Sequence, residues 1–154
     1  MTHEDYMRLA LHYAHLSGKR GEIPVGCVIV RNGEVVSYGN NTRQNKKNAL
    51  HHAEMIAIDR ACRKLGGWRL WECDMYVTLE PCVMCTGAII NARIKNVYFG
   101  AYDPKAGCLG SIVNLNDFPF NHHPEVIGGI LEKECSALLK SFFKKLREEK
   151  KDKG

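Results

Sequence analysis

The stretch Thr78-Leu-Glu-Pro-Cys-Val-Met-Cys85 decides how this sequence is organised. It joins a β-rich run, 74–79, to a run with helical composition, from Pro81 to about Ala92. Proline suits the first position of a helix, so we expect Cys82 and Cys85 both to lie in the first helical turn. Free N–H groups and the helix dipole favour thiolates there, and thiolates are good metal ligands.

Two thiols make half of a metal site, and His52-Ala-Glu54 can complete it. Structural zinc sites fill four positions with protein ligands, whereas catalytic sites use three and leave the fourth for water. With His52 as the third ligand, a bound zinc would lower the pKa of that water to about 7. Glu54 cannot point in the same direction as His52 on a helix, but it can reach the water and a substrate. We therefore predict that Glu54 is the general acid and base.

Each half of this pattern has a simpler explanation when taken alone. A C-x-x-C pair is often half of a structural zinc site or a redox pair, and H-x-E is common by chance. The two together, with Pro81 before the first cysteine, are far more specific. His51 could compete for the metal, but the H-x-E spacing selects His52, and we expect His51 in a loop. The other five cysteines are expected to be small apolar core or surface residues: Cys27, Cys62, Cys73, Cys108 and Cys135.

The first half of the chain predicts one helix, a hairpin and a second helix. Helical periodicity runs from Thr2 to about Ser17, with Thr2 as a cap and Gly18 beyond the end. Asn32-Gly33 is a strong hairpin signal and predicts antiparallel strands at 25–30 and 34–38. A polar segment, 39–48, reads as a solvated loop, and a helix is expected over 52–65.

The second half alternates strands with helices, which predicts an α/β fold with parallel crossovers. Strands are expected at 74–79 and 96–99, with a short edge strand within 126–130. The segment 100–124 lacks periodicity, and a loop of that length is usually functional. An apolar stripe from Cys135 to Leu146 predicts a final helix. We expect one domain over residues 1–154.

The composition is that of an ordinary globular protein. The 154 residues are 45% hydrophobic and 25% charged, with a net charge of +5. No apolar run approaches the roughly 20 residues needed to span a bilayer, and the acidic N-terminus does not resemble an export signal. Seven cysteines, an odd number, favour reduced thiols. We expect a cytoplasmic protein without a membrane partner.

The final helix also carries a possible RNA-binding surface. Phe142 and Phe143 precede a cationic stretch, 144–153. Aromatic rings can stack on bases while cations neutralise phosphates, which is how single-stranded RNA is commonly held. The same two rings also fit the apolar stripe, so core packing and RNA contact both remain open at this stage.

With these motifs, the sequence resembles the zinc-dependent cytidine/deoxycytidylate deaminase superfamily, whose pattern is H-x-E followed by P-C-x-x-C. Within it, the similarity is greatest to the bacterial branch that acts on adenosine in tRNA. The stretches that support this are Glu22-Ile-Pro-Val-Gly26, Asn41-Thr-Arg43, His52-Ala-Glu54, Tyr76 to Cys85, Gly100 to Lys105, Gly110-Ser111, Phe120-Asn-His122 and Phe142-Phe143.

The resemblance implies a three-layer α/β/α sandwich around a five-stranded mixed sheet, one zinc ion per subunit and a homodimer. It implies that the wobble adenosine of a tRNA anticodon stem-loop is flipped into the pocket and converted to inosine. By similarity, the substrate-binding residues are Val25 and Ala53 in the pocket wall, Asn41 on the base, Phe142 and Phe143 on the RNA, and Leu79, Ala101, Asp103, Asn121 and His122 on the anticodon loop or neighbouring bases.

Three residues depart from the family pattern. His123 stands where Arg commonly follows Asn-His, His51 where a small residue usually precedes the zinc ligand, and Cys27 where Ala is common. These departures bear on affinity and substrate range rather than on the type of reaction. Two other functions stay open: a deaminase of a free base or nucleoside, of the guanine or cytidine type, and a non-catalytic RNA-binding module with a structural zinc.

Overall fold

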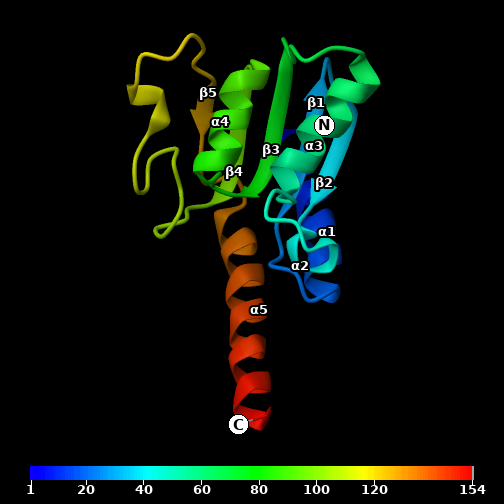
Figure 1. The fold of residues 1–154 in the computed structure, drawn as a ribbon, viewed down its shortest axis with the longest axis vertical. Helices are drawn as coiled ribbons and strands as arrows, with labels where there is room; N and C mark the ends of the chain where they lie inside the picture. The colour runs from blue at the N-terminus through cyan, green and yellow to red at the C-terminus, as the bar shows by residue number, and fades with distance from the viewer. Residues whose placement is uncertain (154) are drawn as a thin grey trace.

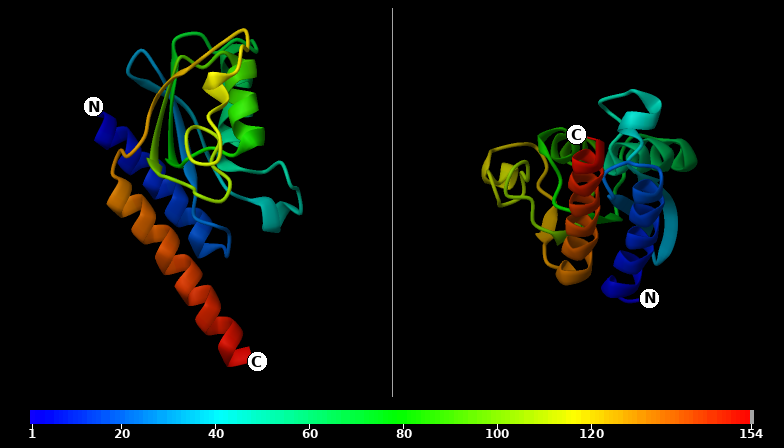
Figure 2. Two further views of the ribbon diagram at one scale, coloured as in Figure 1. Left: turned by 90° about the vertical axis from the view of Figure 1, so that its left-hand side faces the viewer. Right: turned by 90° about the horizontal axis from the view of Figure 1, so that it is seen from below.

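The protein is described here by a computed structural model covering residues 1–153, in which one sheet separates two layers of helices (Figure 1). Helices α3 and α4 cover one face, and α1 and α5 cover the other (Figure 2). The elements in chain order are α1 (His3–Lys19), β1 (Gly26–Arg31), β2 (Glu34–Asn40), α2 (Arg43–Lys46), α3 (Ala53–Leu65), β3 (Cys73–Leu79), α4 (Val83–Ala92), β4 (Asn96–Ala101), the 3-10 turn η1 (Leu115–Asp117), β5 (Glu125–Ile127) and α5 (Glu132–Lys153).

The five strands form a mixed sheet in the order β2-β1-β3-β4-β5. β1 pairs antiparallel with both β2 and β3, whereas β3, β4 and β5 run parallel to one another. Because β3 to β4 is a parallel connection, α4 crosses over the sheet between them. The expected three-layer sandwich around a five-stranded mixed sheet is confirmed. The edge strand expected within 126–130 is also present, as β5, but it begins one residue earlier and ends at Ile127.

The hairpin forms where Asn32-Gly33 predicted it. Asn32 has φ 50° and Gly33 has φ 77°, the left-handed conformations that a type I′ turn requires at both central positions. Asparagine and glycine are the residues that adopt these angles at least cost. The turn therefore fixes the antiparallel register of β1 and β2.

Alternation along the central strands divides the core into two layers. Cys27, Ile29, Met75 and Val77 pack toward α3 and α4. The residues between them, such as Val28 and Tyr76, pack toward α1 and α5. Since successive side chains of a strand point to opposite faces, both faces of β1 and β3 must be apolar, and their sequences read as near-continuous apolar runs.

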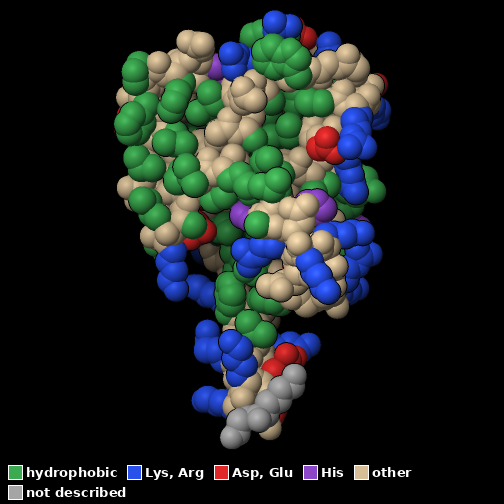
Figure 3. Space-filling model, viewed as in Figure 1, with side chains coloured by type: hydrophobic (Ala, Val, Ile, Leu, Met, Phe, Trp, Pro, Cys, Tyr) green, Lys and Arg blue, Asp and Glu red, His purple; other side chains and the backbone are tan. Residues whose placement is uncertain are grey.

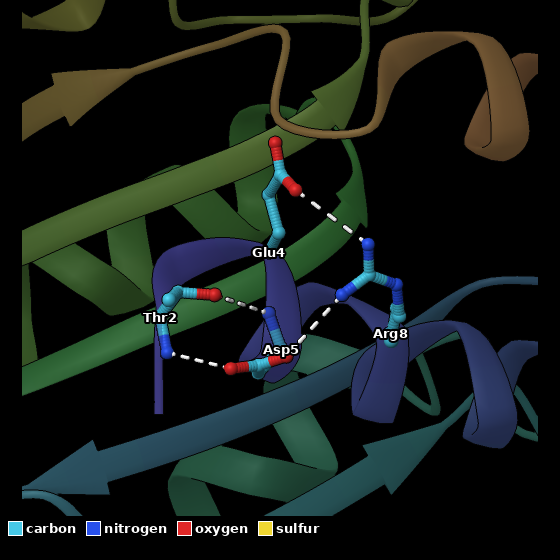
Figure 4. A network of polar contacts seen from close by, with 4 residues as sticks. All are labelled: Thr2, Glu4, Asp5 and Arg8. Atoms are coloured by element: carbon cyan, nitrogen blue, oxygen red, sulfur yellow. Dashed lines mark hydrogen bonds and ion pairs between the residues drawn. The ribbon is translucent and has the colours of Figure 1, made fainter.

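The first helix begins with a reciprocal cap (Figure 4). The Thr2 hydroxyl accepts from the Asp5 N–H at 3.1 Å, and the Asp5 carboxylate accepts from the Thr2 N–H at 2.8 Å. Arg8 forms ion pairs with both Glu4 and Asp5 on the exposed face. The expected cap is confirmed, but α1 continues through Gly18 to Lys19 rather than ending before the glycine. Glycine inside the last turn is tolerated because the helix is already held by its packing.

The helix that carries Cys85, α4, was predicted to begin at Pro81, but it begins two residues later, at Val83. Pro81 is not its first helical residue, because Cys82 has an extended backbone (φ −75°, ψ −179°) and is the N-cap of α4. Cys85 alone lies within the first turn. Proline at this place ends the strand segment instead of starting the helix, consistent with its fixed φ and missing N–H.

Two segments differ from the prediction: residues 39–48 are more ordered than expected, and α5 is more exposed. The predicted loop 39–48 contains the end of β2 and the short helix α2. The apolar stripe of α5 is buried against the sheet only near Cys135, while Phe143 and Leu146 are exposed, because the helix extends beyond the sandwich (Figure 1).

Among the described residues, no helix is long and apolar enough to cross a membrane.

Two strand glycines allow helices to lie directly on the sheet. A Cβ at Gly26 would overlap the carbonyl oxygen of Ala10 in α1, and one at Gly39 would overlap that of Ala53 in α3. In both cases the obstacle is backbone, which cannot rotate away. These glycines therefore set the distance between each helix and the sheet.

We expect Gly26→Ala to lower the free energy of unfolding by about 2–3 kcal/mol, the usual cost of overpacking a core. Gly67→Ala is the matched control, because no described atom outside its immediate neighbours lies within 4 Å of the added carbon. It should change stability by less than about 0.5 kcal/mol. Chemical denaturation of the two variants makes the comparison, and equal effects would contradict this account of Gly26.

Candidate active site

Three potential metal ligands come together at one end of the sheet. The Nδ1 atom of His52 lies 3.7 Å from the Cys82 sulfur and 3.6 Å from the Cys85 sulfur. All three ligand atoms lie within 4.8 Å of one another. The residues selected from the H-x-E and P-C-x-x-C spacings are thus brought together as a group.

The separations within this group fit a zinc ion. A tetrahedral zinc with Zn–N and Zn–S bonds of ordinary length holds its nitrogen and sulfur ligands about 3.6 Å apart. Two thiols and one imidazole are also ligand types that zinc prefers. The protein supplies three ligands, the number typical of a catalytic rather than a structural site.

Two helix starts position these ligands. His52 is the N-cap of α3, and Cys82 is the N-cap of α4. Neither side chain makes a capping hydrogen bond to the described backbone, so both remain directed toward the metal group. Cys85 follows in the first turn of α4. The positive ends of two helix dipoles therefore meet where negatively charged thiolates would bind a cation.

The local contacts also favour an ionised thiol. Hydrogen bonds from the Cys85 thiol and His52 lower the pKa of Cys82 to about 4. The same contact to Cys82 raises the pKa of His52. The pKa of Cys85 is raised, mainly because its thiol donates a hydrogen bond to Cys82 and also because the thiol is buried. Cys82 therefore ionises first in this arrangement.

Glu54 occupies the first turn of α3, two residues after His52. Its side chain is buried and lines the same pocket as His52 and Cys82. Burial raises the pKa of Glu54 to about 7. A carboxyl group with such a pKa can accept and release protons near neutral pH.

Asn41 connects the pocket wall to the start of α3. Its Oδ1 accepts from the Ala53 N–H at 2.9 Å, and its Nδ2 donates to the Ile23 carbonyl at 3.1 Å. One N–H of the amide remains available, and Asn41 lines the pocket. The side chain is thus fixed in orientation before any substrate arrives.

The pocket around these groups has a volume of about 710 Å³, within the usual range for ligand sites. Its walls come from the ends of β1, β2 and β3, from α2 and α3, and from α5. The predicted site residues that line it are Val25, Asn41, His52, Glu54, Leu79, Cys82, Asp103, Phe142 and Phe143. The two phenylalanine rings meet edge to face, with centroids 5.5 Å apart.

Other predicted residues lie behind the pocket or away from it. Ala53 and Ala101 are buried and do not line the pocket. Asn121 lines a second groove beside α4, and the ring of His122 bonds to the Ile94 carbonyl at 2.6 Å, before the start of β4. The pocket lies at the other end of that strand. The structure therefore does not bring Asn121 and His122 to the pocket of their own chain.

The three residues that depart from the family pattern contact only their own surroundings. His51 Nδ1 contacts the Thr42 hydroxyl at 3.3 Å and is not one of the grouped ligands, as its expected place in a loop requires. His123 Nε2 contacts the Phe118 carbonyl at 2.8 Å within its own loop. Cys27 is fully buried, and burial raises its pKa well above the usual range.

Several pocket residues were missed by sequence reasoning. Arg43 and Gln44 on α2, and Leu146 and Lys150 on α5, add charge and apolar surface to the rim. Glu22 and Glu80 line it as buried carboxylates. The cations were visible in the sequence as members of polar segments, but no spacing marked the two acids.

The chain is similar in sequence to known zinc-binding deaminases. The family model for the zinc-binding region of cytidine and deoxycytidylate deaminases matches residues 1–101. The chain is 46% identical over 153 residues to the tRNA-specific adenosine deaminase of Bacillus subtilis (strain 168), covering 98% of this chain and 95% of the relative.

Two solved structures are also similar. One, from studies of A-to-I editing by tRNA:A34 deaminases at the wobble position of transfer RNA, has a TM-score of 0.85 and 42% identity, covering 88% of this chain and 99% of that one. The other, guanine deaminase from Bacillus subtilis, has a TM-score of 0.64 and 38% identity, covering 66% of each chain. The family match spans His52, Glu54 and both ligand cysteines, and we conclude that the chain belongs to the zinc-dependent cytidine and deoxycytidylate deaminase family, together with the tRNA-specific adenosine deaminases.

Proposed function

We propose that this protein is a zinc-dependent hydrolase that deaminates adenosine to inosine at the wobble position of a tRNA anticodon. The observation that carries the proposal is a single pocket in which the three-ligand metal group and Glu54 form the floor, and aromatic and cationic residues of α5 form the rim. The floor suits hydrolysis, and the rim suits single-stranded RNA. The relatives named above support the same substrate.

His52, Cys82 and Cys85 would hold the zinc ion. When bound there, zinc supplies a nucleophile at neutral pH by lowering the pKa of a water molecule to about 7. Glu54 would accept a proton from the attacking water and deliver it to N1 of the adenine ring. It then helps transfer a proton to the leaving amino group, so that water and adenosine become inosine and ammonia.

The remaining pocket residues would orient the base. The free amide N–H of Asn41 is directed by its two internal bonds and can donate to the purine. Val25 and Leu79 supply apolar walls, and Ala53 supports Asn41 through its backbone N–H. A base held at a fixed angle presents C6 to the nucleophile without a further ordering cost.

The rim would hold the RNA strand on either side of the flipped base. Phe142 and Phe143 can stack on neighbouring bases, and Arg43 and Lys150 can neutralise phosphates. Asp103 lies at the same rim, and Ala101 is buried at the end of β4 nearby in the chain. For Asn121 and His122, an RNA contact would have to lie outside this pocket, since neither lines it.

We also propose that residues 1–154 form one deaminase domain that works in the cytoplasm. Support for one domain comes from the tRNA:A34 deaminase structure, 99% of which this chain covers. The cytoplasm is where a tRNA substrate is found, and all seven cysteines are free in the structure.

A free purine base is the second candidate substrate, favoured by the similarity to guanine deaminase. The open rim formed by α5 argues against it, because a free base needs only the floor and a closed lid. A third possibility, a non-catalytic RNA-binding module with a structural zinc, leaves buried Glu54 without a role.

A direct assay separates the three functions. The zinc-loaded protein is incubated with an anticodon stem-loop RNA carrying adenosine at the wobble position and, separately, with guanine, cytidine and adenosine. We expect inosine at the wobble position, read by sequencing, and little ammonia from the free compounds. Ammonia from a free compound, with no inosine in the RNA, would contradict the proposal.

Replacement of Glu54 tests the proton-transfer role. We expect Glu54→Gln to lower turnover by about 10³-fold, within the range that positioned general acids and bases contribute. Zinc content, measured by metal analysis, and RNA binding, measured by fluorescence anisotropy, should persist. Asp59→Asn is the control, because Asp59 is an exposed acid on the same helix. Full activity in Glu54→Gln would contradict the proton-transfer role.

We propose that the second groove is a homodimer interface. It is lined by Met55, Met84, Leu115 and Phe120, among others, and hydrophobic side chains gather on this face over α4 and the adjoining loop (Figure 3). Apolar patches of this kind usually mark an interface. Sedimentation equilibrium should show a dimer that Met84→Glu converts to monomer, whereas a monomeric parent protein would contradict the proposal.

A further inference from the structure

Two buried carboxylates in the pocket wall take no part in the chemistry described above. Glu22 and Glu80 are each only 2% exposed. Burying a carboxylate is costly unless hydrogen bonds replace the lost water. In both residues these bonds come mainly from backbone N–H groups of a segment at the pocket rim.

Glu80 is bonded to the segment 103–111. Its Oε1 accepts from the Asp103 N–H at 3.0 Å, and its Oε2 accepts from the N–H groups of Leu109 at 3.1 Å and Ser111 at 3.0 Å. The Ser111 hydroxyl donates to Oε1 as well. A Cβ at Gly107 would overlap the carboxylate, so the segment wraps directly around it.

Glu22 is bonded to α2 in the same manner. Its Oε1 accepts from the Gln44 N–H at 3.0 Å, and its Oε2 accepts from the backbone N–H and the side-chain amide of Asn45, both at 2.7 Å. These contacts hold the short helix that carries Arg43 and Gln44 to the pocket. A four-residue helix has little stability of its own, so this anchoring must come from outside it.

The two anchored segments lie on different sides of α5 near the pocket mouth (Figure 1). One carries Asp103 and Ala106, and the other carries Arg43 and Gln44, and all four line the pocket. The parts of these segments that reach the pocket rim are not buried and belong to no long helix or strand, so without the carboxylates they would be mobile and RNA would have to order them on binding. Ordering before binding removes that cost from the affinity.

We propose that Glu22 and Glu80 are positioning residues that fix both rims of the pocket before RNA binds. The inference rests on the proposed function for the identity of the ligand, but not for the bonding itself. Neither carboxylate contacts the substrate in this account; each acts through the rim residues that it holds. Their loss should therefore weaken RNA binding more than it slows the chemical step.

Glu80→Gln tests the first rim. The amide nitrogen that replaces one oxygen cannot accept from the N–H groups facing it. In the zinc-loaded, full-length protein, we expect KM for the stem-loop RNA to rise about tenfold while kcat stays within about twofold, because an ordering cost is added to binding alone. Amide hydrogen exchange at Leu109 and Ser111 should quicken by about tenfold or more, and zinc content should not change.

Glu22→Gln tests the second rim in the same way. Exchange should quicken at Gln44 and Asn45 but not at Leu109, and KM should rise with kcat retained. Glu34→Gln is the matched control, because Glu34 is an exposed acid beside the β1–β2 turn. It should alter neither exchange in these segments nor KM.

If Glu80→Gln does not fold, a milder variant can still test the proposal. Ser111→Ala removes the hydroxyl donor but leaves the carboxylate and its N–H bonds, and it should raise KM about two- to threefold, as the loss of one hydrogen bond implies. Unchanged KM in the folded variants, or a fall in kcat at constant KM, would overturn the proposal.

The assays also separate this inference from the proposed function. If the parent protein makes no inosine, the proposed function fails. Hydrogen exchange and RNA-binding titrations on the same variants would still decide whether the two carboxylates hold the rims and whether the rims affect affinity. Unchanged exchange in Glu80→Gln or Glu22→Gln would overturn the positioning role even with a fully active deaminase.

Discussion

The site depends on the meeting of two helix N-termini over one end of the sheet. α3 begins at His52 and α4 begins at Cys82, so both N-cap positions serve as potential metal ligands. At an ordinary N-cap the side chain bonds to the free N–H groups of its own helix. Here the imidazole and the thiol point instead toward each other, and the positive ends of both helices face the place where thiolates and a carboxylate gather. The close approach of α3 to the sheet at Gly39 sets the position of the first of these helix starts.

Acidic groups in the pocket wall are used in two different ways. Glu54 is buried among few partners, which raises its pKa to about 7 and suits it to proton transfer. Glu80 is also buried, but its carboxylate accepts hydrogen bonds from backbone N–H groups, which fixes the chain around it. The number of donors around each carboxylate thus distinguishes the chemical residue from the structural ones. The same fold places both types within one cavity.

Local signals predicted the fold well where a single residue pair or period determines the backbone. Asn32-Gly33 specified the hairpin, the 3.6-residue period specified α1, and H-x-E with P-C-x-x-C selected the residues that meet in the metal group. Pro81 was misplaced because proline is acceptable both before a helix and at its first position. Glu22 and Glu80 were missed because their partners are mainly backbone groups 22 to 31 residues away, and backbone donors leave no trace in a sequence. The location of Asn121 and His122 depends on the path of a long aperiodic loop, which no periodicity describes.

The contribution of α5 to the pocket has a consequence for the order of synthesis. The three metal ligands and Glu54 all precede Thr86 in the chain, and the sheet strands that support them precede Tyr102. Phe142 and Phe143 belong to α5 and line the same pocket. Because synthesis runs from the N-terminus, the residues of the metal group are made before those of the aromatic wall. A growing polypeptide therefore carries all of its metal ligands before it carries the two phenylalanine rings of the same pocket.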